Sequence, residues 1–489
     1  MSIFGPRWHN WAHTLDAKPD VLARPRTEED VQDIVRKAVA DGRRVRAGGT
    51  GHSWSAGVPT DGVIMLTEHL TRPGSGKPFV DTGGATPVVR VGPGLNQGQL
   101  QHVTQPHGLA FPTLGVVYDI SLGGFIANGC HGTGWEQPTV SDLVTGMRVV
   151  LADGSVREFS QEATPDEMDF ARVNLGSIGI ITELQFEPVP LCNAHAVDET
   201  KPMEALLSRK DPTVLRDQIT SSENPYVELF WFPFNTKGSL EGEVWFKHYR
   251  PTDEPCDGRI PTRVWDRIQS ELGQIPYYEV TLNPKSTPSL MPLLWDLVPT
   301  RDEYIAPITD VFHYQHYTFP VTDISFAIPI SVGEGGVADF SEANEAWWSF
   351  VDAIGKAAER DEYPINVCLH ARFIRNSQAL LSPSHAPAGS PTHYCYIEGL
   401  TFQPRHLETL SPGVRQFHDF FAQMGPRWME LGGVPHWGKD FSAIPSVFEH
   451  IRGIYGERLR RWLAWRDGLD PDRVFWNAFM DQIFGGPGL

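Results

Sequence analysis

The chain has few cysteines, no spacing that would pair them, and no long apolar run. Its five cysteines, at positions 130, 192, 256, 368 and 395, include no CxxC pair. An odd number without paired spacing argues against a disulfide framework and a structural zinc site, and it favours a reducing compartment such as the cytoplasm. No stretch approaches the roughly 18 apolar residues of a membrane helix, and the first ten residues lack the apolar segment of a signal peptide. We therefore expect a cytoplasmic protein with no membrane partner.

Positive charge is also scarce, with 41 Lys and Arg against 60 Asp and Glu and a formal charge of -19. A surface this acidic repels nucleic acid, so we expect no nucleic-acid partner. Two nucleotide-binding motifs are missing as well. The glycine-rich segments match neither GxGxxG after a first strand nor GxxxxGK[ST], which disfavours a nicotinamide Rossmann domain and a P-loop nucleotidase.

Glycine is abundant, and many of the 46 glycines lie between Gly42 and Gly179. They form three tracts: residues 46–55 (RAGGTGHSWS), 120–134 (ISLGGFIANGCHGTG) and 174–186 (NLGSIGIITELQF). Glycine allows positive φ and close approach to the main chain, and successive amide groups in such turns can bind an anion. One tract alone could equally be a tight turn. Three tracts together favour a dinucleotide cofactor whose diphosphate is held by main-chain donors.

The periodicity predicts a mixed α+β fold. The pattern of expected helices and strands changes at Pro188-Val189-Pro190. Before that point we expect a helix after Thr27 and short strands around the glycine tracts. After it we expect aromatic strands and intervening helices. The expected elements are strands over 43–47, 61–66, 87–92, 182–186, 226–234, 244–249, 311–319 and 368–374, a hairpin over 147–159, and helices over 28–41, 95–107, 342–358 and 448–466.

The three tracts, in their order and spacing, resemble the FAD-contacting segments of the vanillyl-alcohol-oxidase (PCMH-type) superfamily of oxidoreductases. Residues 435–439 (PHWGK) resemble the HWxK signature of its aldonolactone and alditol oxidase branch. The resemblance spans nearly the whole chain. It implies a two-domain α+β fold, with an FAD-binding domain (1–190), a substrate or cap domain with a large antiparallel sheet (191–434), and a C-terminal segment that returns to the first domain (435–489).

The resemblance also implies that FAD is bound covalently, because His52 occupies the position whose imidazole bonds to the flavin 8α-methyl group. Residues 111–115, where some relatives carry a second, cysteinyl link, contain no cysteine, so a single covalent bond is expected. The resemblance further implies the following FAD contacts: Gly48, Gly49, Thr50, Gly51, Ser53, Ser121, Gly124, His131, Gly132, Thr133, Gly176, Gly179 and Ile181.

Two catalytic candidates, His436 and Lys439, fall on the HWxK motif. A cation beside the flavin stabilises its anionic reduced form. The other candidates depart from the family pattern. Ser325 stands where a glutamate is expected, with Ala327 in place of its arginine, and in the next strand only Arg372 remains. These losses predict a pocket less polar than the family's sugar sites.

A histidine could supply the missing base, and His370, His313 and His316 are the candidates. His313 and His316 are three residues apart, so on a strand they point to opposite faces and do not predict a metal site.

The expected reaction is oxidation of a CH–OH group in a small hydroxylated molecule, such as a sugar lactone or a polyol. Hydride passes to the flavin, and O2 reoxidises it with formation of H2O2. Two alternatives stay open: a dehydrogenase that uses another electron acceptor, and a flavin-binding protein whose catalytic residues have degenerated.

Overall fold

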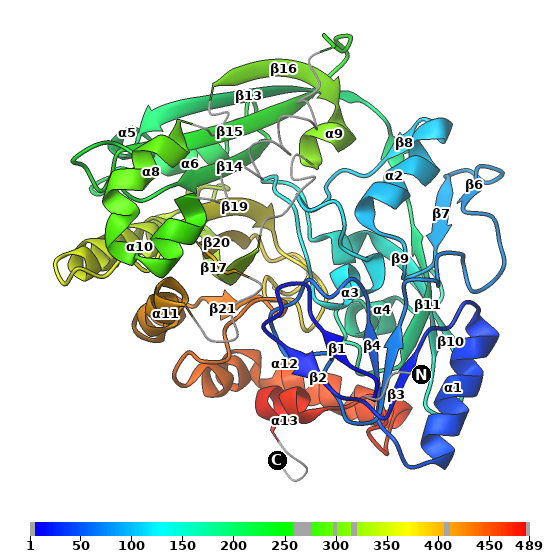
Figure 1. Ribbon diagram of the computed structural model, residues 1–489. Helices are drawn as coiled ribbons and strands as arrows, with labels where there is room; N and C mark the ends of the chain where they lie inside the picture. The colour runs from blue at the N-terminus through cyan, green and yellow to red at the C-terminus, as the bar shows by residue number, and fades with distance from the viewer. Residues whose placement is uncertain (1–4, 259–275, 297–300, 314–319, 405–410, 486–489) are drawn as a thin grey trace.

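The computed structural model describes residues 5–258, 276–296, 301–313, 320–404 and 411–485 (Figure 1). Helices and strands are mixed, and the strands gather in an N-terminal region and in one large antiparallel sheet, as the α+β prediction requires. Within the described ranges, no helix has both the length and the apolarity needed to cross a bilayer.

Two small sheets build the N-terminal region. A parallel sheet has the order β3 (Val21–Ala23), β5 (Val63–Leu66), β4 (Val45–Gly48). An antiparallel sheet has the order β10 (Val156–Ser160), β9 (Val144–Val150), β11 (Ile180–Phe186), β7 (Val88–Val91), β6 (Val80–Asp81). Helix α1 (Glu28–Ala40) begins at Thr27, whose hydroxyl accepts from the Asp30 amide while the Asp30 carboxylate accepts from the Thr27 amide. Its buried Val31 and Val35 join the small core around β4 and β5.

The glycine tracts lie at the ends of these elements, where the chain must turn. The first tract begins in β4, the second forms the short helix α3 (Leu122–Ala127), and the third leads into β11. Gly51, Gly176 and Gly179 have φ values of +75°, +65° and +151°, which an L side chain rarely adopts. The tracts are therefore loops whose backbone conformations require glycine.

The second region is a nine-stranded sheet, and its order is β16 (Asp302–Pro307), β13 (Asn193–Pro202), β15 (Glu243–Thr252), β14 (Tyr226–Trp231), β19 (Leu369–Arg375), β20 (His393–Phe402), β17 (Val321–Val332), β18 (Ala338–Asp339). The ninth strand, β21 (Val434–Pro435), also pairs with β17.

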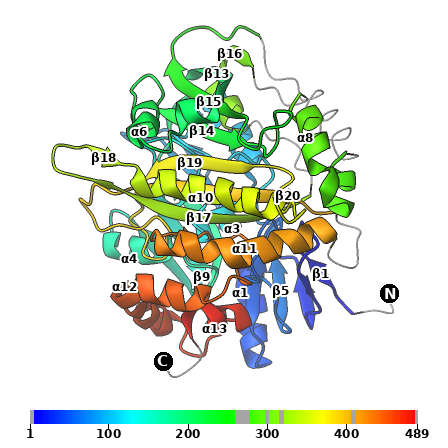
Figure 2. The same ribbon diagram turned by 90° about the vertical axis from the view of Figure 1, so that its left-hand side faces the viewer.

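The two faces of this sheet differ in chemistry. Paired residues in antiparallel strands share a face, so Leu229, Ala371, Ile397 and Phe326 form one apolar row across four strands. Helices α10 (Ser341–Ala358) and α11 (Pro412–Glu430) cover this face (Figure 2). The Phe326 ring, for example, lies 5.6 Å from Trp428 of α11. The opposite face carries charged side chains and looks toward the glycine tracts.

The C-terminal helices α12 (Val447–Leu469) and α13 (Ala478–Phe484) pack back onto the N-terminal region. The fully buried Arg466 forms an ion pair with Asp470 and donates from Nε to the Ser177 carbonyl, at 3.0 Å. The Val45 amide donates to the Val474 carbonyl, at 2.8 Å. The C-terminal segment therefore contacts both the first and the third glycine tracts and holds them in place relative to each other.

Most of the expected elements are confirmed, but the strand predicted over 311–319 is wrong. Residues Ile308–Phe312 form helix α9 after Pro307, and 314–319 lie outside the described residues. Ile308, Val311 and Phe312 recur at helical spacing, so the apolar stretch is also compatible with a helix.

Candidate active site

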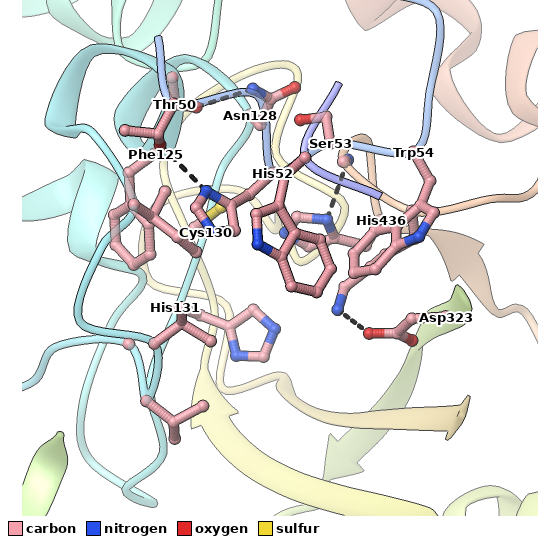
Figure 3. Close-up of a pocket in the computed structure, with 18 of the residues that line it drawn as sticks. Thr50, His52, Ser53, Trp54, Phe125, Asn128, Cys130, His131, Asp323 and His436 are labelled. Atoms are coloured by element: carbon pink, nitrogen blue, oxygen red, sulfur yellow. Dashed lines mark hydrogen bonds and ion pairs between the residues drawn. The ribbon is translucent and has the colours of Figure 1, made fainter. Parts of the chain in front are cut away.

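A cavity of about 500 Å³ separates the glycine tracts from the charged face of the large sheet. All three tracts line it, together with strands β14, β15, β17, β19 and β20 and residues 436, 438 and 439. Figure 3 shows side chains of the first two tracts facing Asp323 and His436 across this space. The sequence motifs therefore meet at one place.

The first two tracts are joined by reciprocal hydrogen bonds. The Thr50 amide donates to the Ser121 hydroxyl at 3.2 Å, and the Ser121 amide donates to the Thr50 hydroxyl at 3.1 Å. A Cβ on Gly49 would collide with the Ser121 side chain. Gly124 lines the cavity, and a Cβ there would meet only the Ser121 hydroxyl, at 3.9 Å. At Gly49 and Gly124 this wall carries no side chain, which leaves room beside the main chain for an extended dinucleotide, so these residues fit FAD.

His52 lies half-buried on this wall. Its Nδ1 is 3.0 Å from the Thr50 hydroxyl, and its ring stacks on Trp11, with centroids 5.2 Å apart and an interplanar angle of 21°. The Trp11 amide donates to the Gly51 carbonyl at 2.8 Å. The N-terminal segment therefore packs against one face of the imidazole ring.

Eleven of the fourteen residues predicted to contact the cofactor line the cavity, and Gly48, Gly132 and Thr133 do not. Gly48 packs beneath the wall against Leu66 and Val58. Thr133 donates its hydroxyl to the Val227 carbonyl, at 2.5 Å, and so ties the second tract to the large sheet. Gly48, Gly132 and Thr133 therefore lie outside the cavity lining, and the FAD contacts predicted for them stay a prediction.

Glu398 is the centre of the ionic cluster on the sheet face. Its carboxylate lies 2.7 Å from His370 Nδ1, 2.9 Å from Arg372 Nη2 and 3.0 Å from Lys439 Nζ. His370 Nε2 lies 3.0 Å from Glu228. Burial alone would raise the pKa of Glu398, but Lys439, Arg372 and His370 together hold this pKa well below its ordinary value. Glu398 is therefore the ionised counter-charge of the cluster.

Asp323 is the second carboxyl beside Lys439, with which it forms an ion pair. Burial and the nearby charge of Glu398 raise the pKa of Asp323 to about 7, although Lys439 opposes the shift. Its Oδ1 is buried and has no hydrogen-bond partner among the described residues. Asp323 thus combines an unoccupied acceptor atom with a pKa close to neutrality.

Lys439 remains a cation between these carboxyls, because Asp323 and Glu398 raise its pKa despite the opposing effect of burial. Its Nζ also lies 5.2 Å from the Trp54 ring centre. His436, by contrast, is neutral, because burial and the charge of Lys439 lower its pKa to about 3. The Gly438 amide donates to His436 Nδ1, which places the proton of the neutral ring on Nε2.

The prediction of a less polar pocket is wrong at this end of the cavity. Ser325 does lack the expected carboxylate: it is fully buried, and it is absent from the cavity wall. Glu398 faces Ser325 from the neighbouring strand β20 and supplies the carboxylate from there. Sequence reasoning missed Glu398, Glu228 and Asp323. The available signal was a single carboxylate inside an otherwise apolar strand, as in YVELFW and HYCYIEGLTF.

Of the three alternative histidines, His370 lies in the ionic cluster and His313 does not. His313 is buried outside the cavity wall and lies edge-on to Tyr118, with ring centroids 5.8 Å apart. His316 lies outside the described residues.

Asp323→Asn tests the protonation of the Asp323 carboxyl by a measurement of stability that does not depend on activity. Because its pKa in the folded chain lies above the ordinary value of 3.8, its contribution to stability is present below about pH 4 and is lost as the pH rises toward about 7. We expect the free energy of unfolding of the variant, relative to wild type, to increase from about pH 4 to about pH 7 and then to level off. Urea unfolding measures it. A difference that stays constant with pH would contradict the assignment. Asp419→Asn, at an exposed carboxyl outside the cavity, is the matched control.

The chain matches two known protein families and is similar to named lactone-oxidising proteins. Residues 19–160 match the FAD binding domain family, and residues 184–483 match the D-arabinono-1,4-lactone oxidase family. The chain is 27% identical to an L-gulono-1,4-lactone dehydrogenase of Mycobacterium tuberculosis, over 98% of this chain and 99% of that protein. It is 25% identical to L-gulonolactone oxidase of Bos taurus, over 98% of each chain.

Solved structures share the fold. Cholesterol oxidase from B. sterolicum superposes with a TM-score of 0.78 at 17% identity, covering 98% of this chain and 97% of the other. At this identity the likeness shows the fold alone. The lactone oxidase match, in contrast, covers more than half of the chain, and the FAD domain match covers the first two glycine tracts. The chain therefore belongs to the D-arabinono-1,4-lactone oxidase family and is an FAD-dependent oxidoreductase that oxidises a hydroxylated substrate.

Proposed function

We propose that the protein oxidises a CH–OH carbon of a polyhydroxylated molecule of the sugar-lactone or polyol type, with FAD attached covalently through His52. The observation that carries this proposal is the Glu398–Lys439–Asp323 cluster, which faces the wall formed by the glycine tracts. Bound FAD supplies a two-electron acceptor for hydride. The chain's own residues must therefore bind the alcohol, orient it and take its hydroxyl proton.

Asp323 is the proton acceptor in this proposal. Its Oδ1 has no hydrogen-bond partner among the described residues, and its pKa of about 7 suits a general base at neutral pH. Lys439, held against Asp323 and Glu398, donates to the substrate oxygen and offsets the negative charge that develops nearby. The C–H carbon loses a hydride and the O–H loses a proton, which leaves a carbonyl.

His370 has a positioning role in this scheme. Both of its ring nitrogens already face carboxylates, so neither is available to take a substrate proton while these contacts persist. His370 instead holds Glu398 in place, and Glu398 in turn orients Arg372 and Lys439. The buried ionic cluster disfavours a degenerate flavin-binding protein, since an unused cluster of buried charges would be costly to retain.

His52→Ala tests the covalent link. Wild-type protein denatured in acid should keep its yellow colour and flavin fluorescence on the polypeptide, and the variant should release all of it, because no other side chain is proposed to bond the flavin. The measurement is flavin absorbance in the acid pellet and the supernatant. The exposed His69→Ala is the matched control and should retain the colour. Flavin that stays attached after the loss of His52 would refute the assignment.

The substrate class and the electron acceptor are tested on wild-type protein. L-gulono-1,4-lactone and D-arabinono-1,4-lactone, added without oxygen, should bleach the flavin absorbance, and a polyol series should extend the panel. Admission of air should then restore the colour with one H2O2 formed per lactone oxidised. If bleaching occurs but oxygen restores the colour slowly and an added dye restores it quickly, the protein is a dehydrogenase, as one relative is named. If no lactone or polyol bleaches the flavin, the proposed substrate class is wrong.

A further inference from the structure

The cavity does not end at the ionic cluster. Its wall continues across the sheet to Asp198 of β13, Lys247 of β15 and Tyr304 of β16. From Asp323 on β17 to Asp198 on β13 the path crosses five strand-to-strand steps, and at about 4.8 Å per step this is roughly 24 Å. A single lactone ring spans only about one or two such steps. The cavity is therefore longer than the reacting part of the proposed substrate needs.

The middle of this extension is apolar and aromatic. Its lining includes Phe230 and Trp245 on the sheet, Phe232 directly after β14, and Leu294 on helix α8 (Thr287–Trp295). With Tyr277, Val367 and Cys368 they belong to a hydrophobic cluster separate from the main core. We call this part of the cavity, defined by Phe230, Phe232, Trp245, Leu294 and Val367, the aromatic arm.

The aromatic arm is continuous with the ionic cluster. The Phe230 ring stacks on His370, with centroids 4.0 Å apart and an interplanar angle of 11°, and it stacks on Trp245 at 4.6 Å and 28°. Three rings on adjacent strands thus form one floor that begins at a partner of Glu398. An apolar group attached to a substrate at the cluster would lie directly on this floor.

The far end of the arm is polar, and Asp198 there already has partners in Lys247 and Trp245. Lys247 Nζ lies 3.2 Å from Asp198, and Trp245 Nε1 donates to the same carboxylate at 2.9 Å. Because Lys247 and Asp198 neutralise each other, this ion pair does not call for a charged ligand at the far end of the arm.

We propose that the aromatic arm binds an apolar ring or chain carried by the substrate, so that the substrate class is a hydroxylated molecule with an apolar substituent, of the aryl or alkyl glycoside type. The inference rests on the proposed function, because the hydroxylated part must sit at Glu398 and Lys439. The paired residues and stacking distances assign the apolar part to the arm.

The test compares matched ligands. The holoenzyme is titrated without oxygen with methyl β-D-glucoside and with phenyl β-D-glucoside, and the dissociation constant is read from the perturbation of flavin absorbance. We expect the phenyl compound to bind at least tenfold more tightly. Leu294→Trp, which narrows the arm, should remove this difference and leave the constant for the methyl compound unchanged. Leu293→Trp, at the adjacent position with an exposed side chain, is the control and should retain the difference.

Two results would overturn the inference. Equal binding of the two glucosides, or binding of neither, by a protein whose flavin is bleached by a lactone would refute the aromatic arm and leave the proposed function intact. If no lactone, polyol or glucoside perturbs or bleaches the flavin, the proposed function fails and the inference fails with it. Should Leu294→Trp not fold, Leu294→Ala replaces it and should weaken only the phenyl compound, by about tenfold.

Discussion

The rest of this site depends on the need to compensate charges that are buried between the large sheet and the glycine tracts. Glu398 is nearly inaccessible, and without partners its ionised form would be strongly destabilising. Three cations or hydrogen-bond donors compensate this charge: His370 and Arg372 from the adjacent strand, and Lys439 from the C-terminal segment. Because Lys439 follows β21, which pairs with β17, the ionic cluster is complete only where the large sheet and the C-terminal segment pack together.

The same packing places the cluster opposite the glycine tracts. Arg466 and Asp470 fix the third tract, and Thr133 ties the second tract to the sheet. The wall formed by the first two tracts then faces a sheet whose other surface is covered by α10 and α11 (Figure 2). An antiparallel sheet with one apolar and one charged face therefore packs against helices on one side and lines the candidate active site on the other.

Sequence patterns predicted the loops and the elements around them well, because glycine, capping residues and short-range periodicity act locally. The capped helix after Thr27 and the tracts ending near His52 and His131 are examples. The ionic cluster depends instead on strand order. Glu398 compensates for Ser325 only because β20 lies beside β17, and nothing local to either strand records that pairing. The strand predicted over 311–319 is wrong for a related reason, since a short apolar run is compatible with a strand and with a helix.

The central claim is that Asp323 accepts the hydroxyl proton while Lys439 orients the alcohol. The rate of anaerobic flavin bleaching in a single turnover, measured against pH for wild type and Asp323→Asn, tests it most directly. The account predicts that the wild-type rate rises with pH and levels off above about 7, and that the variant is slower by about 10²–10⁴-fold and lacks this inflection. A variant that binds flavin and keeps the wild-type rate and pH profile would contradict the account.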